Sequence, residues 1–150
     1  MNGIDRFNLR VYGIHVQEGQ LLVTDEIRGH MPMTKLPGGG LEFGEGLEEG
    51  LKREWQEELQ AEIEVGDIFF VNRFFLKSAF RKRDQVICFY FPVTPISPLI
   101  GTFTQQPLDF PSQENDQQVF RWVPLHSLSP DDFTFPVDKA MLPILQASHT

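Results

Sequence analysis

The most informative part of this 150-residue chain is Gly39–Ala61, which reads GGLEFGEGLEEGLKREWQEELQA. Seven glutamates, one lysine and one arginine give this segment a net charge of −5, whereas the whole chain carries −8. Apolar residues recur at four-residue steps: Leu47, Leu51, Trp55 and Leu59. This spacing is typical of the buried stripe of an amphipathic helix. We therefore predict a helix from Gly46 to Leu59.

Three glutamates of this predicted helix share one face, because Glu54, Glu57 and Glu58 stand at positions i, i+3 and i+4. Like charges at this spacing oppose helix formation by a few tenths of a kcal/mol per pair. Carboxylate oxygens are the ligands that Mg²⁺ and Mn²⁺ prefer. An acid-rich face can also be merely solvated, so the triple alone is a weak signal.

The residues before the helix, Lys35–Gly40, contain a proline and three glycines. Such a cluster lets the backbone turn sharply and approach a ligand closely. A pyrophosphate would be repelled by the glutamates alone, but bound cations reverse the sign of the local field. Metal ions that bridge phosphate oxygens can also orient and activate a water molecule. The glycine-rich segment Lys35–Gly40 and the predicted helix together indicate a site that acts on phosphate groups.

The spacing of the fixed residues carries a family resemblance. Gly39 is followed after five residues by Glu45, and after seven more by the run Arg53-Glu54-Trp55-Gln56-Glu57-Glu58-Leu59-Gln60-Ala61. This pattern resembles the Nudix box of the Nudix hydrolases, G-x5-E-x7-R-E-U-x-E-E-x-G-U, where U is apolar. Every charged position matches. Gln60 stands where the family has glycine, and Trp55 is bulkier than the usual aliphatic residue.

The resemblance implies a role for each matching residue. The expected metal ligands are the carbonyl of Gly38 and the side chains of Glu54, Glu57 and Glu58. Glu45 is expected to hold Arg53 in an ion pair that orients the metal-binding face. The catalytic base is left open among five acids: Glu54, Glu57, Glu42, Glu114 and Asp116. The implied cofactor is Mg²⁺, with Mn²⁺ as a substitute.

The resemblance also implies a fold, an α/β (α+β) Nudix-type α/β/α sandwich with a mixed β-sheet, in a single domain spanning residues 1–150. The residues predict strands at Phe7–Val16, Gln20–Thr24, Ile63–Leu76, Gln85–Val93 and Val119–Val123. A hairpin turn is expected at Gln17-Glu18-Gly19, with loops at Arg28–Thr34 and Pro95–Gln117. A closing helix at Val137–Ala147 should be kinked or split by Pro143.

The expected activity is hydrolysis of a phosphoanhydride bond in a nucleoside diphosphate linked to another moiety. ADP-ribose, nucleotide sugars and nucleoside triphosphates all remain open as substrates. The alternative is a Nudix-fold module that senses a nucleotide without cutting it. An isoprenyl-diphosphate isomerase would need a reactive cysteine, and Cys88 lies in an apolar run.

The parts that would recognise the rest of the substrate are not singled out by any spacing. Candidate rings for stacking on a base are Tyr12, Phe43, Phe74, Phe80, Tyr90 and Phe110, most of them expected in the core. Candidate cations are Arg28, Lys35, Arg73, Lys77, Arg81 and Arg83. The net charge of −8 argues against duplex DNA and anionic membranes as partners. We expect a cytoplasmic protein, with a homodimer suggested by analogy alone.

Overall fold

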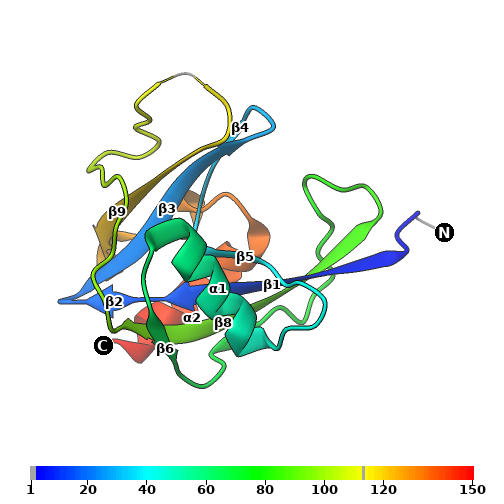
Figure 1. The fold of residues 1–150 in the computed structure, drawn as a ribbon, viewed down its shortest axis with the longest axis horizontal. Coiled ribbons are helices and arrows are strands. Elements are labelled where there is room, and N and C mark those ends of the chain that lie inside the picture. Colours follow the sequence, from blue (N-terminus) through cyan, green and yellow to red (C-terminus); the bar gives the residue numbers. More distant parts are fainter. Residues whose placement is uncertain (1–2, 113) are drawn as a thin grey trace. The chain divides into compact units, whose positions relative to one another are not determined.

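The computed structural model describes residues 3–112 and 114–150, and the chain forms two compact units. The first unit comprises the residues up to Gly13 together with Gly38–Pro98. The second comprises Ile14–Pro37 together with Leu99–Thr150. Each unit has its own β-sheet and one helix (Figure 1). The predicted mixture of helices and strands is therefore confirmed.

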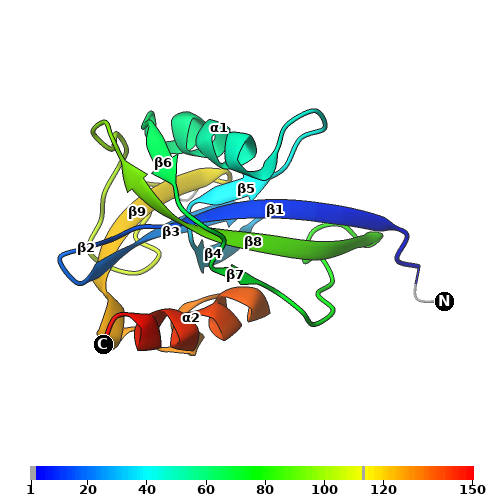
Figure 2. The same cartoon turned by 90° about the horizontal axis from the view of Figure 1, so that it is seen from below.

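The sheet of the first unit has the order β5 (Gly38–Gly40), β1 (Arg6–Ile14), β8 (Asp84–Pro95) and β6 (Ile63–Val65), and β7 (Phe70–Val71) also pairs with β8. The β5, β6 and β7 strands are antiparallel to their neighbours. The β1 and β8 strands run in the same direction, so the sheet is mixed, and α1 (Leu47–Leu59) covers one of its faces (Figure 2).

The predicted apolar stripe of α1 packs on this sheet. Leu51, Trp55 and Leu59 are all fully buried. The indole of Trp55 lies against Gly13 of β1, where an added Cβ would be 2.6 Å from Nε1. The helix is therefore seated by its buried stripe, which leaves its glutamate-bearing side at the margin of the packed surface.

The second unit is built around β3 (Gln20–Arg28), which pairs with β2 (Val16–Gln17), β4 (Met31–Lys35) and β9 (Gln117–Pro124). Two short 3₁₀ helices, Leu125–Ser127 and Pro130–Asp132, precede α2 (Pro136–Ser148). The predicted hairpin turn is confirmed, because Gln17 pairs with Gln20 across two residues with positive φ, Glu18 and Gly19.

Two ion pairs lie inside the second unit. Arg121 donates from Nε and Nη2 to Asp25, at 2.6 and 3.0 Å, and Thr34 donates to the same carboxylate at 2.6 Å. Lys35 lies 2.8 Å from Glu26. Burial raises the pKa of Glu26, but the neighbouring cations outweigh burial and bring this pKa below its ordinary value. Each of these four buried charges thus has a partner of opposite sign.

Two details of the predicted secondary structure are wrong. Arg28–Thr34 is not a loop, because a two-residue turn at Gly29-His30, both with positive φ, brings β4 back onto β3. Only the short β6 and β7 strands form within Ile63–Leu76.

The predicted closing helix is present as α2, which is one continuous helix with Pro143 inside it. Its residues Met141, Leu142 and Leu145 are buried and stabilise the helix through packing. No helix among the described residues is long and apolar enough to cross a membrane.

Candidate active site

The β5 strand brings its backbone unusually close to its neighbours. Gly38 has a φ of 151°, and a Cβ there would be 2.0 Å from the carbonyl oxygen of Val11. A Cβ on Gly39 would be 2.6 Å from Oε1 of Glu54, so this carboxylate rests directly on the glycine backbone. Only glycine permits both approaches. The β5 strand therefore forms a cradle for the Glu54 carboxylate.

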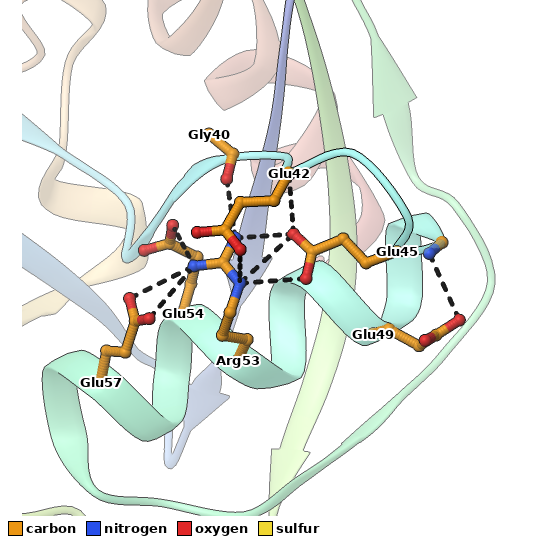
Figure 3. Close-up of polar contacts among 8 residues, drawn as sticks. Gly40, Glu42, Glu45, Glu49, Arg53, Glu54 and Glu57 are labelled. Carbon is orange, nitrogen blue, oxygen red and sulfur yellow. Dashed lines mark hydrogen bonds and ion pairs between the residues drawn. The ribbon is translucent and has the colours of Figure 1, made fainter.

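The loop after β5 and the start of α1 are fixed by glutamates. Glu49 accepts a hydrogen bond from the backbone N–H of Gly46 at 3.3 Å, at the helix N-terminus (Figure 3). Glu45 accepts one from the N–H of Glu42 at 2.8 Å. These contacts bring Glu45 to the side of α1 that carries Arg53, eight residues further along the chain.

Arg53 is the centre of the polar network in Figure 3. Its Nη2 lies 2.7 Å from Glu45 and donates to the carbonyl oxygen of Gly40 at 2.9 Å, while Nε donates to Glu45 at 3.0 Å. The expected Glu45–Arg53 ion pair is thus present. Glu45 raises the pKa of Arg53, and Arg53 lowers the pKa of Glu45. Both groups therefore stay charged at neutral pH.

The third nitrogen of this guanidinium, Nη1, contacts two of the predicted metal ligands. It donates to Glu54 at 3.1 Å and to Glu57 at 3.3 Å. Glu54 is 14% exposed and Glu57 is 56% exposed. Glu58 is half-buried, and its Oε2 atom is buried. The guanidinium thus lies between the two carboxylates that it contacts.

The shared metal ligation by Glu54, Glu57 and Glu58 stays a prediction. Among residues 3–112 and 114–150, no three acidic, histidine or cysteine side chains form a group that could hold a metal ion. Arg53 shares Nη1 between Glu54 and Glu57 and so neutralises part of their charge.

The chemistry of these side chains nevertheless fits a hard divalent cation. All the donors are oxygens, and the Glu54 carboxylate is already held in the glycine cradle. Gathering them around an ion would require Nη1 of Arg53 to release Glu54 and Glu57, while Nε and Nη2 keep Glu45 and Gly40. The contact with the exposed Glu57 is of a kind worth only about 0.2–1 kcal/mol. Breaking the contact with Glu57 therefore costs little.

Both departures from the box pattern have a structural explanation. Trp55 fits because its neighbour on β1 is Gly13, which has no side chain to occupy the space of the indole. Gln60 ends α1 in the left-handed conformation, with φ of 50° and ψ of 34°, and its N–H donates to Gln56. This is the backbone shape that a glycine adopts most readily at a helix C-terminus. The path of the chain after the helix is thus preserved.

Of the acids considered as a base outside the helix, Glu42 lies at the network, with a carboxylate oxygen 3.7 Å from Nε of Arg53. Glu114 and Asp116 belong to the second unit, where both are exposed. Among the candidate rings, Tyr12 and Tyr90 are buried, whereas Phe43, Phe74 and Phe80 are exposed. The sequence did not single out Arg10, which lies beside Gly40 and donates to Tyr12.

Comparisons with known proteins show the family and the fold of this chain. The model of the NUDIX domain family matches residues 6–144. The solution structure of the E. coli ORF135 protein has a TM-score of 0.70 and 17% identity, with 100% of this chain and 95% of that chain covered. The MutT protein of Methanosarcina mazei Go1 has a TM-score of 0.65 and 20% identity over 97% of each chain.

An ADP-ribose pyrophosphatase from Streptococcus suis 89-1591 has a TM-score of 0.57 and 15% identity, with 95% of this chain and 92% of that chain covered. At these identities the likeness is one of fold. No curated protein matches the chain. The family model covers most of the sequence, including the box, β5 and β9. The chain therefore belongs to the Nudix family, which confirms the predicted class of enzyme, a Nudix pyrophosphohydrolase.

Proposed function

We propose that this protein hydrolyses a phosphoanhydride bond in a nucleoside diphosphate linked to another moiety, with Mg²⁺ as its cofactor and Mn²⁺ as a substitute. The observation that supports this most is the Glu54 carboxylate resting on Gly39, with Glu57 on the adjacent turn and Arg53 locked to Glu45. A glycine strand and a glutamate face then meet at one place. This arrangement suits the anionic groups of a metal-bound diphosphate.

The proposed ligands of the metal are the carbonyl oxygen of Gly38 and the carboxylates of Glu54, Glu57 and Glu58. When bound, the cation would neutralise phosphate charge and favour attack by water. Arg53 and Glu45 act as positioning residues, because their ion pair ties α1 to the carbonyl of Gly40.

The proton of the attacking water would pass to a carboxylate at the site. Glu57 is better placed than Glu54 for this role, since its side chain is 56% exposed against 14% for Glu54. An exposed carboxylate can exchange its proton with solvent after each turnover. Glu54, seated in the glycine cradle, is better suited to a fixed ligand position.

The substrate is proposed to be ADP-ribose, a nucleotide sugar or a nucleoside triphosphate. Solved structures with the same fold include proteins described as a MutT protein and an ADP-ribose pyrophosphatase. All these molecules share a nucleoside attached to a diphosphate, which is the unit that we propose this site binds. We further propose that residues 1–150 act as one Nudix domain in the cytoplasm and assemble as a homodimer, which light scattering would test.

The decisive experiment is a panel of these nucleotides incubated with Mg²⁺ or Mn²⁺, with the products identified by mass. We expect Glu57→Gln and Glu58→Gln each to lower kcat by at least ~100-fold at saturating Mg²⁺, because a charged ligand is lost. Glu48→Gln is the matched control, since Glu48 is exposed in the first turn of the same helix. Unchanged turnover in both test variants would exclude this site. Nucleotide binding without any product would instead identify a sensing module.

Metal binding should also weaken as the pH falls, because protons compete with the cation for the same carboxylates. A calorimetric titration with Mn²⁺ at neutral and at mildly acidic pH measures this directly. An affinity that does not change between the two conditions would contradict carboxylate ligation.

A further inference from the structure

Arg10 occupies a defined position beside the glycine strand. It lies in β1 directly opposite Gly40 of β5. Its Nε donates to the phenol oxygen of Tyr12 at 2.6 Å. Tyr12 is only 6% exposed and packs against Tyr90, with ring centroids 5.3 Å apart. The guanidinium is therefore oriented by a phenol that is itself fixed in the core.

The β5 strand separates Arg10 from Glu54. A Cβ on Gly39 would point at Glu54, whereas a Cβ on Gly40 would have Nη1 of Arg10 as its nearest contact, at 3.6 Å. Successive residues of a strand face opposite sides of the sheet. Since β5 is the outermost strand of its sheet, the edge of this strand lies between the Glu54 side and the Arg10 side.

The charge of Arg10 is unusual among the arginines of this chain. Six arginines form an ion pair with a carboxylate: Arg6, Arg28, Arg53, Arg81, Arg83 and Arg121. Within the described residues, Arg10 and the exposed Arg73 form none. The phenol oxygen of Tyr12, with a smaller contribution from Glu54, raises the pKa of Arg10, so it is always a cation. A half-buried guanidinium of this kind is suited to an anionic ligand, above all a phosphate bound through two N–H groups.

We propose that Arg10 binds the third, terminal phosphate of a nucleoside triphosphate, so that this protein prefers nucleoside triphosphates to ADP-ribose and nucleotide sugars. This inference rests on the proposed function. A third phosphate adds negative charge beside a segment that already carries −5, and it therefore needs a cation outside the glutamate face. ADP-ribose and nucleotide sugars have only two phosphates, so the third phosphate that Arg10 would bind is absent from them.

The test is calorimetric binding, in the presence of Mg²⁺, of a nucleoside triphosphate and of ADP-ribose, each with a non-hydrolysable bridge. Arg10→Gln should weaken triphosphate binding by about 10- to 100-fold, which is the worth of hydrogen bonds to a charged group. Binding of the ADP-ribose analogue should change by less than about twofold. Equal losses for the two ligands, or no loss for the triphosphate, would overturn the proposal.

Three further variants separate recognition from general effects. Arg73→Gln removes the same charge from an exposed position and should leave both affinities unchanged; an equal loss would show that only net charge matters. Arg10→Lys keeps the charge but not the planar fork, and should weaken triphosphate binding less than Arg10→Gln. Tyr12→Phe removes the orienting phenol oxygen and should also weaken triphosphate binding, with no effect on the ADP-ribose analogue.

The binding readout distinguishes failure of this inference from failure of the proposed function. If the wild-type protein hydrolyses no nucleotide, the function is wrong, while the affinities still decide the role of Arg10. If Arg10→Gln binds both analogues as the wild type does but hydrolysis occurs, only the inference about Arg10 is wrong. Thermal unfolding of each variant verifies that it is folded.

Discussion

The contact between Gly13 and Trp55 provides a quantitative test of how this chain accommodates a tryptophan in its box. A Cβ on Gly13 would lie 2.6 Å from Nε1 and 2.8 Å from Cε2 and Cζ2 of the fully buried indole. Carbon atoms in good contact are about 3.5–4.0 Å apart. Because the ring is rigid and enclosed, it cannot move aside. We expect Gly13→Ala to destabilise the protein by about 1–3 kcal/mol through overpacking.

Replacing the indole should reverse this effect. Trp55→Leu leaves a cavity, and its cost should lie somewhat below the roughly 3–5 kcal/mol of a tryptophan-to-alanine change. In the double variant, the new methyl group of Ala at position 13 would enter the space that the indole has left. The two costs should therefore not add, and we expect a favourable coupling of about 1–2 kcal/mol.

Urea unfolding followed by circular dichroism, with similar m-values for all variants, gives the four free energies that this cycle needs. The control cycle pairs Gly13→Ala with Trp122→Leu, because Trp122 belongs to β9 of the second unit and is half-buried. That pair should be additive. Additivity within about 0.5 kcal/mol for Gly13 and Trp55 as well would refute the steric explanation.

Three further outcomes are expected. Gln60→Gly should raise the free energy of unfolding by about 0.5–1 kcal/mol, since it relieves a left-handed residue; a lower urea midpoint would contradict this. Arg121→Met should lower the free energy of unfolding by about 3–5 kcal/mol, because the buried Asp25 loses its partner. Adding Asp25→Asn should recover part of this lost stability. Arg53 lowers the pKa of Glu45, so the stability from this pair is complete above the ordinary value of 4.5 and is lost as the pH falls through the lowered pKa. Glu45→Gln should flatten the stability profile in this acidic range, and a profile with the wild-type slope would disagree.

The features that could be predicted from the sequence are those encoded by local spacing. The four-residue spacing of apolar residues predicted the helix, and Glu18-Gly19 predicted the turn. The resemblance to the Nudix box predicted the pairing of Glu45 with Arg53. The position of Arg10 has no such signal, because it depends on the pairing of β1 with β5, which places Gly40 opposite it. The same holds for Asp25 and Arg121, which are 96 residues apart in the chain.

The misassigned segments show how tertiary pairing overrides local preference. Met31–Lys35 contains Pro32, which lacks an N–H group and is normally excluded from central strands. In the structure this proline is tolerated because β4 is paired only on one side, with β3. The spacing of the helix residues also did not indicate that Nη1 of Arg53 contacts both Glu54 and Glu57.

The triglycine strand β5 has a consequence for how this protein could change during evolution. The carboxylate of Glu54 lies on one side of this strand and the guanidinium of Arg10 on the other, and only the backbone of β5 lies between them. Substitutions on the Arg10 side could therefore alter the choice of nucleotide without disturbing the hydrolytic side. Gly38 and Gly39 leave no such latitude, because a Cβ would lie 2.0 Å from the carbonyl oxygen of Val11 or 2.6 Å from Oε1 of Glu54. The strand would then allow the choice of nucleotide to change while the hydrolytic reaction stays the same.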